Sequence, residues 1–112
     1  MSPADFTGAT YWGGRPVARR AADAEPRGRV VTTGTICSTG ITEVGGSSSF
    51  SCVLFDGSGE VGLLFIGRSS VPGIEIGARC TVEGTARMGS DRLVLWNPIY
   101  RLGLPDEDAG ID

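Results

Sequence analysis

The sequence of 112 residues contains no histidine and no lysine, because all ten of its basic residues are arginines. General acid–base and nucleophilic chemistry therefore lose two of their commonest side chains, and the carboxylates are scattered singly over turns and strand surfaces. No serine lies in a nucleophile-elbow pattern, and no glycine-rich stretch leads from a strand into a helix as a phosphate loop does. The sequence predicts a protein that is not an enzyme, with no catalytic residue and no cofactor.

Cysteine is scarce as well. The chain has three cysteines, an odd number: Cys37, Cys52 and Cys80. They lie in apolar strand patterns rather than in CxxC pairs, so we expect buried, reduced thiols. A zinc site would need a further Cys or a His, so no metal is expected. No apolar leader and no run of about 18 apolar residues is present. We therefore expect a cytoplasmic protein that does not contact membranes.

Glycine and proline, by contrast, are frequent, with 18 Gly and 6 Pro at short intervals. This punctuation favours many short strands over long helices, and 40% hydrophobic residues support one small domain with a modest core. A formal net charge of -3 argues against a generic polyanion binder, because nonspecific nucleic-acid affinity depends on phosphate neutralisation. An all-arginine cation set suits phosphate and base contacts, although a GC-rich coding bias is the simpler explanation.

The strongest structural pattern runs from Cys52 to Arg68, where two apolar stretches flank Asp56-Gly57-Ser58-Gly59. Asp can bond its own backbone in such a turn and Gly can take positive φ, so the segment predicts a β-hairpin. Alternation assigns six residues to the core: Phe50, Cys52, Leu54, Val61, Leu63 and Phe65. The opposite faces are more apolar than a solvated sheet needs, so we expect something to contact that side.

Further strands are predicted around this hairpin. Residues 29–44 form one long, bent strand interrupted by glycines, and residues 45–49 form a flexible linker. Residues 68–77 form a short crossover with an apolar plug of Val71, Ile74 and Ile76. The last two strands cover residues 78–88 and 92–102, and Pro98 marks an edge or a break in the second. Five strands connected in this way fit a small closed barrel, which leaves no sheet edge exposed.

Both ends of the chain are predicted to lie outside the barrel, which we place at residues 29–104. Residues 1–28 lack a sustained apolar period and are expected to be a flexible segment. Within them, Tyr11, Trp12 and Arg15 either form a stacking and phosphate-contact arm or tuck Trp12 against the domain. Residues 105–112 form an acidic, disordered tail that solubilises the protein, mimics nucleic acid or docks a basic partner.

Several short motifs carry a resemblance to a known family. They are Thr33-Gly34-Thr35, Leu54-Phe55-Asp56-Gly57-Ser58-Gly59, Gly67-Arg68 before Val71-Pro72-Gly73-Ile74, Val82-Glu83-Gly84, and Leu93-Val94-Leu95 with Asn97-Pro98-Ile99-Tyr100. Together they make residues 29–102 resemble the small actinobacterial nucleic-acid-binding proteins of the oligonucleotide/oligosaccharide-binding (OB) fold. More distantly, the stretch is similar to the wedge domain of the RecG helicase and to the anticodon-binding barrels of tRNA synthetases. The resemblance implies an all-β fold, a five-stranded OB-fold Greek-key barrel with a short crossover in place of a long helix.

The resemblance also implies ligand contact on the face of the second and third strands, framed by the connections between strands one and two and strands four and five. The nucleic-acid-binding residues expected there, aromatics for stacking and arginines for phosphates, are Phe55, Arg68, Arg87, Arg92, Trp96, Tyr100 and Arg101. Val53, Leu64 and Ile66 make the same face aliphatic, which suits a protein interface equally well.

Two functions therefore stay open from the sequence. The first is binding of single-stranded DNA or RNA, as an accessory in nucleic-acid metabolism. This binding is expected to be weak and salt-dependent, because six arginines in residues 29–102 are matched by six acids. The second is a protein-interaction barrel, or one that pairs with a second copy as a homodimer, without significant nucleic-acid affinity.

Overall fold

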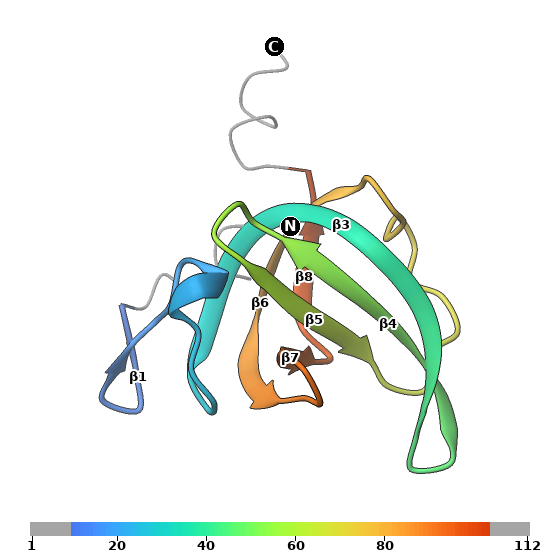
Figure 1. Ribbon diagram of the computed structural model, residues 1–112, viewed down its shortest axis with the longest axis horizontal. Coiled ribbons are helices and arrows are strands. Elements are labelled where there is room, and N and C mark those ends of the chain that lie inside the picture. The colour runs from blue at the N-terminus through green and yellow to red at the C-terminus, as the bar shows by residue number, and fades with distance from the viewer. Residues whose placement is uncertain (1–9, 104–112) are drawn as a thin grey trace.

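The computed structural model describes residues 10–103, and their secondary structure is almost entirely β. The main sheet contains β3 (Arg29–Val44), β4 (Ser47–Phe55), β5 (Glu60–Phe65), β6 (Arg79–Met88), β7 (Leu93–Trp96) and β8 (Ile99–Leu102). The strand order is β3-β4-β5-β7-β6, and β6 pairs back with β3, so the sheet closes into a barrel (Figure 1). The predicted all-β barrel is confirmed, and β7 and β8 together occupy the place of the predicted fifth strand.

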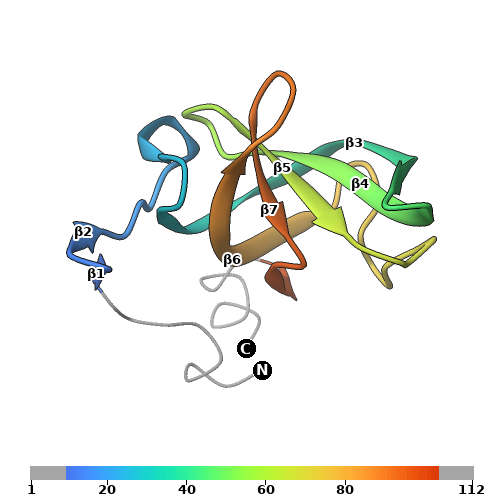
Figure 2. The same cartoon turned by 90° about the horizontal axis from the view of Figure 1, so that it is seen from below.

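The fifth strand is divided between β7 and β8. β7 pairs with β5 in parallel and with β6 in antiparallel fashion (Figure 2). β8 continues along β6 in antiparallel pairing (Figure 1). Asn97, at the division, has a positive φ of 49°, and its side-chain oxygen accepts a 2.8 Å hydrogen bond from the N–H of Ile66. Pro98 follows and has no N–H to donate, so the ladder is interrupted at the position that Pro98 predicts.

β3 is the long, bent strand that the alternation predicts. Its first half pairs with β6 and its second half with β4, so the strand curves from one side of the barrel to the other (Figure 1). Gly34 lies on this curve and allows the end of β4 to approach closely, because a Cβ there would collide with the carbonyl oxygen of Phe55. Beyond it a β-bulge shifts the register between Ile36 and Ser38.

The bulge explains the one cysteine that departs from its predicted burial. Cys37 lies at the shift of register and is exposed, whereas Cys52 and Cys80 are buried and all three are free thiols. Burial raises the pKa of the Cys52 thiol to about 12 and that of Cys80 to about 11. Burial of a free thiol was thus predicted correctly for two of the three positions.

The flexible linker predicted over residues 45–49 is wrong. Gly45 and Gly46 form a two-residue turn with φ values of 59° and 83°, and residues 47–49 already belong to β4 and pair with residues 42–44. Two successive positive φ values match a tight hairpin turn to the right-handed twist of its strands, and two glycines supply them without strain. The result is a β3–β4 hairpin that projects beyond the barrel at the lower right of Figure 1.

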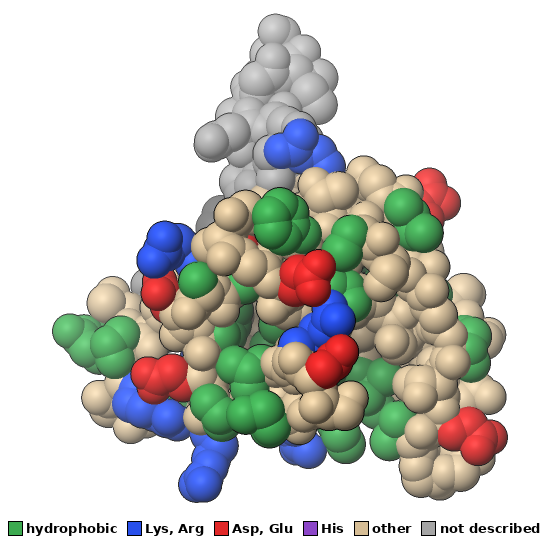
Figure 3. All heavy atoms as spheres, in the orientation of Figure 1, with side chains coloured by type: hydrophobic (Ala, Val, Ile, Leu, Met, Phe, Trp, Pro, Cys, Tyr) green, Lys and Arg blue, Asp and Glu red, His purple; other side chains and the backbone are tan. Residues whose placement is uncertain are grey.

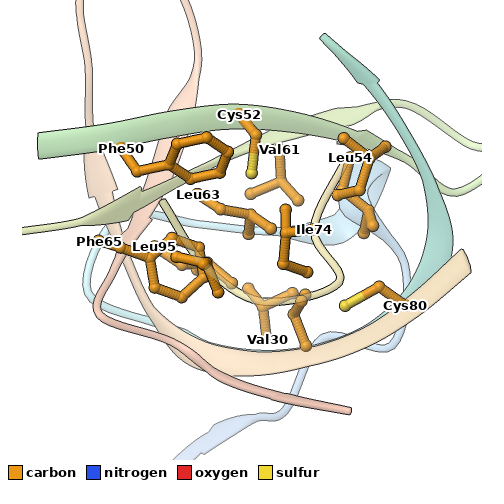
Figure 4. Close-up of a cluster of buried hydrophobic side chains, with 14 residues drawn as sticks. Val30, Phe50, Cys52, Leu54, Val61, Leu63, Phe65, Ile74, Cys80 and Leu95 are labelled. Carbon is orange, nitrogen blue, oxygen red and sulfur yellow. The ribbon is translucent and has the colours of Figure 1, made fainter. Parts of the chain in front are cut away.

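The barrel is filled by the residues that the alternation places inside. All six predicted core residues are buried, and Figure 4 shows them pointing inward with Val30, Ile74, Cys80 and Leu95. Of the predicted plug in the crossover, Val71 and Ile74 are buried but Ile76 is exposed. The crossover is a series of turns, so alternation does not govern which of its side chains face the core.

The N-terminal segment, defined as residues 10–28, lies against the barrel, whereas the sequence predicts a flexible segment over residues 1–28. It contains a small hairpin of β1 (Tyr11–Trp12) and β2 (Arg15–Pro16) and a short 3-10 helix, η2 (Ala21–Asp23). Ala18 pairs with the start of β3 through two backbone hydrogen bonds of 2.9 Å, and Val17 beside it is buried. Because these contacts involve the backbone and small side chains, apolar periodicity could not reveal them.

Asp56 fastens this segment to the barrel. Its carboxylate accepts hydrogen bonds from the N–H of Ser58 (2.9 Å), within the predicted turn, and from the hydroxyl of Thr32 (2.6 Å) and the N–H of Ala21 (2.7 Å). Burial alone would raise the pKa of Asp56, but these hydrogen bonds outweigh it and lower the pKa to about 2. The predicted acidic tail at residues 105–112 lies outside the described residues.

Candidate functional site

A groove of about 420 Å³ crosses the outer face of β4, β5 and β7, on the side opposite the core. Its floor is made by outward residues that are neighbours across the strands. Val53 pairs with Gly62 and Gly62 with Val94, while in the next row Leu64 pairs with Trp96. Gly62 keeps the floor low, because a Cβ there would come within 3.1 Å of a Val94 methyl group. The sequence predicts that something contacts the apolar outer face of the β4–β5 hairpin, and Val94 and Trp96 of β7 supply part of that contact.

Two hairpins form the walls of the groove. The β3–β4 hairpin contributes Thr42 and Val44, and the hairpin between β6 and β7 contributes residues 88–92. In chain order, these are the connections between strands one and two and between strands four and five of the barrel. The groove therefore lies on the face, and between the two connections, that the OB resemblance implies.

Trp96 is the aromatic side chain of the groove. It is 40% exposed, and the guanidinium carbon of Arg87, from β6, lies 4.2 Å from the centre of its ring. This is a cation–π stack, in which the arginine covers part of the ring and brings a positive charge to it. Both residues were predicted as ligand contacts, and the pairing of β6 with β7 brings them together.

Arg92 also lines the groove, but two carboxylates neutralise it. Its guanidinium donates to Glu60 at 2.7 Å and to Asp91 at 3.3 Å. The hydrogen bond between the Arg92 guanidinium and the Asp91 carboxylate raises the pKa of Arg92 and lowers the pKa of Asp91. Figure 3, which looks onto β4 and β5, shows acidic and basic side chains side by side among apolar ones on this face. The groove therefore offers stacking surface and shape rather than an excess of positive charge.

The other predicted site residues lie outside the groove lining. Phe55, at the end of β4, is 48% exposed, and Arg68 is exposed on the loop after β5. Tyr100 packs its ring edge-on against the core residue Phe65, with ring centres 5.7 Å apart, so its ring is occupied in packing. Arg101 follows it on β8. Of the three aliphatic interface residues predicted, Val53 and Leu64 form the floor, and Ile66 lies just beyond the end of β5.

Sequence reasoning missed several residues of the groove. Val94 alternates with the buried Leu95 and shares a strand face with Trp96, so the period of two in residues 93–96 indicates its outward position. Thr42 and Val44 could not be found in the same way, because the segment after them was interpreted as a linker. Met88, exposed at the end of β6, carries no distinguishing pattern.

Nothing in the described part of the chain provides a metal centre, since residues 10–103 hold no cluster of three or more Cys, Asp or Glu side chains suited to an ion. In the same range no helix has the length and apolar character needed to span a membrane. A scan against protein-family models finds no match for the chain, and a search of curated proteins finds none either.

Proposed function

We propose that this protein binds single-stranded DNA or RNA weakly, through the groove on β4, β5 and β7, as an accessory module in nucleic-acid metabolism. The observation that carries the proposal is the exposed Trp96 with Arg87 stacked on it, at the edge of an apolar groove framed by two hairpins. Unpaired bases present flat apolar faces, which stack on aromatic rings and guanidinium planes, while arginine also contacts phosphate.

The charge of the groove supports weak binding. Since Arg92 is neutralised by Glu60 and Asp91, Arg87 is the cation best placed to meet a phosphate near Trp96. Few phosphate contacts mean a low affinity at physiological salt and a shallow salt dependence for the groove alone. The OB-type barrel and the resemblance of residues 29–102 to nucleic-acid-binding proteins agree with this function, although a fold by itself does not establish one.

The aliphatic floor favours a second candidate, a protein interface. Val53, Leu64 and Val94 would suit the apolar side chains of a partner, or of a second copy of the chain, as well as they suit base faces. In that case the barrel would associate without significant affinity for nucleic acid.

Titration of fluorescently labelled oligo-dT and oligo-rU at low and moderate salt distinguishes the two candidates. We expect weak binding that decreases only moderately with salt and that is weakened at least about five-fold in Trp96→Ala, the cost of losing one stacked base. Phe55→Ala is the matched control, because Phe55 is similarly exposed but lies outside the groove. Binding lost equally in Phe55→Ala would place the site at the β4–β5 turn. Absence of binding at low salt, with a dimer by light scattering, would support the protein interface instead.

A further inference from the structure

Next to the groove lies a second pair of tryptophan and arginine. Trp12, in β1, is 46% exposed, and the guanidinium carbon of Arg29 lies 5.3 Å from the centre of its ring. Arg29 in turn extends over β6, where it donates to Glu83 at 3.0 Å and to the hydroxyl of Thr85 at 3.3 Å. The Trp12–Arg29 pair thus has the same composition as the Arg87–Trp96 pair, and each arginine of the two pairs lies along the outer face of β6.

A cavity of about 480 Å³ separates the two pairs. Its lining consists of Arg29, Glu83, Gly84, Thr85, Arg87, Trp96, Asn97 and Ile99. Trp96 lines the groove as well, so this cavity begins at the edge of the groove at Trp96. Thr85 and Arg87 point to the same face of β6, because side chains two positions apart on a strand share a face.

We propose that a bound single strand leaves the groove at Trp96, crosses β6 through this cavity and reaches Trp12, so that the N-terminal segment forms the second half of the binding surface. The inference rests on the function proposed above and adds to it a path and a source of positive charge. Neighbouring strands lie about 4.8 Å apart, so the path from β5 over β7 and β6 to the start of β3 measures roughly 14 Å. A few nucleotides cover that distance, within the range of about 4–16 nucleotides per OB barrel.

The distribution of charge supports this path. Residues 10–28 contain four arginines and two acids, Asp23 and Glu25, whereas residues 29–103 contain six arginines and six acids, and Arg29 is paired with Glu83. Figure 3 shows basic side chains gathered around the N-terminal segment, at the lower left. Because affinity for nucleic acid depends mainly on phosphate neutralisation, a strand confined to the groove would avoid the most positive part of the molecule.

The N-terminal segment is also held in a fixed place, as a binding surface requires. Gly13 and Gly14 have φ values of 58° and 82° and close the β1–β2 hairpin, which places Trp12 opposite Arg15. The Arg15 guanidinium donates to the carbonyl oxygens of Pro26 (3.2 Å) and Arg27 (3.0 Å). The backbone N–H of Arg27 donates to the carbonyl oxygen of Ala86 on β6 at 2.7 Å, which fixes the backbone of the exposed Arg27 next to β6.

The experiment compares short and long oligonucleotides, dT4 and dT12, by fluorescence anisotropy with the full-length chain. For Trp12→Ala we expect at least about a five-fold loss of affinity for dT12 and little change for dT4, because the short strand is held in the groove. Trp12→Phe, which keeps a stacking ring, should retain most of the affinity for dT12. Tyr11→Ala is the matched control, since Tyr11 is the adjacent aromatic of the same hairpin.

Charge is tested separately with Arg27→Gln. Its salt slope for dT12 should be shallower by about 0.7, the loss of one phosphate contact on a single strand. Trp96→Ala should weaken dT4 and dT12 alike. If Trp96→Ala has this effect while Trp12→Ala and Arg27→Gln leave dT12 binding unchanged, the proposed path is overturned and the groove function stands. If no variant and no oligonucleotide shows binding, the proposed function itself fails.

Discussion

The groove and the N-terminal segment differ in what they offer a ligand. The groove has an apolar floor and an exposed tryptophan, but its arginine Arg92 is paired with Glu60 and Asp91. The N-terminal segment has an excess of arginine and a second exposed tryptophan, but it is fastened to the barrel through Asp56 and the start of β3. Stacking surface and positive charge therefore come from different parts of the chain, and mutations can separate them.

The largest effect is expected for Asp56→Ala, which removes one of the links between the N-terminal segment and the barrel. The N–H of Ala21 and the hydroxyl of Thr32 would lose their acceptor, so we expect the free energy of unfolding to fall by about 2–3 kcal/mol. Urea unfolding followed by circular dichroism measures this. Glu43→Ala, on the projecting β3–β4 hairpin, is the matched control and should change stability by less than about 0.5 kcal/mol. Equal stability of the two variants would show that Asp56 is not a fastening residue.

The same carboxylate predicts a change of stability with acid. The pKa of Asp56 is lowered to about 2 in the folded protein, whereas an unfolded aspartate titrates near about 3.9. The unfolded chain therefore binds the proton first, and the stabilisation, fully present above about pH 4, is lost as the pH falls toward about 2. Urea unfolding of the wild type and Asp56→Ala across this window should give converging curves. Parallel curves would contradict the assignment.

A smaller effect is expected when the charge balance of the groove is altered. Glu60→Gln removes one of the two carboxylates that neutralise Arg92, which frees positive charge for a phosphate. We expect the affinity for oligo-dT to rise about two- to five-fold at low salt, with a steeper salt dependence. Glu75→Gln, on the crossover, makes the same change of charge away from the groove. If both variants gain equally, net charge rather than the position of Arg92 is responsible.

The smallest effect on binding is expected at Cys37, which touches neither tryptophan pair. Its thiol contacts the backbone carbonyl of Val53 at 3.5 Å, so Cys37→Ser should change the affinity by less than about two-fold. In the native protein one thiol should react rapidly with a thiol reagent, because burial raises the pKa of Cys52 to about 12 and that of Cys80 to about 11. Rapid reaction of a second thiol would indicate a barrel that opens readily.

The fold could be predicted from the sequence to the extent that alternation governs it. The core side chains of β4 and β5, the bend at Gly34 and the break at Pro98 all follow from a period of two and from the chemistry of glycine and proline. Gly45-Gly46 was misinterpreted because the same glycines suit a linker and a tight turn. A tight turn forms only if the serines after the glycines pair with another strand. A local sequence pattern does not indicate such pairing.

The candidate site was predicted in part. The sequence predicted Arg87, Arg92 and Trp96 as residue types suited to nucleic acid. It could not show that Arg87 stacks on Trp96 or that Glu60 and Asp91 neutralise Arg92, because these contacts depend on strand register. The sequence left open whether Trp12 tucks against the domain or belongs to an arm. It could not reveal how residues 10–28 dock, because the docking relies on backbone hydrogen bonds to Asp56 and to the start of β3 rather than on an apolar face. Contacts of this kind leave no periodic trace in the sequence.

The most direct test of the groove as a binding site is an amide ¹H–¹⁵N spectrum of the full chain titrated with oligo-dT at low salt. We predict that the largest shifts occur at the indole N–H of Trp96 and at the amides of Gly62, Leu64 and Val94, which line the groove. Shifts confined to the crossover at residues 68–77 and to β8, or no shifts at all, would contradict it.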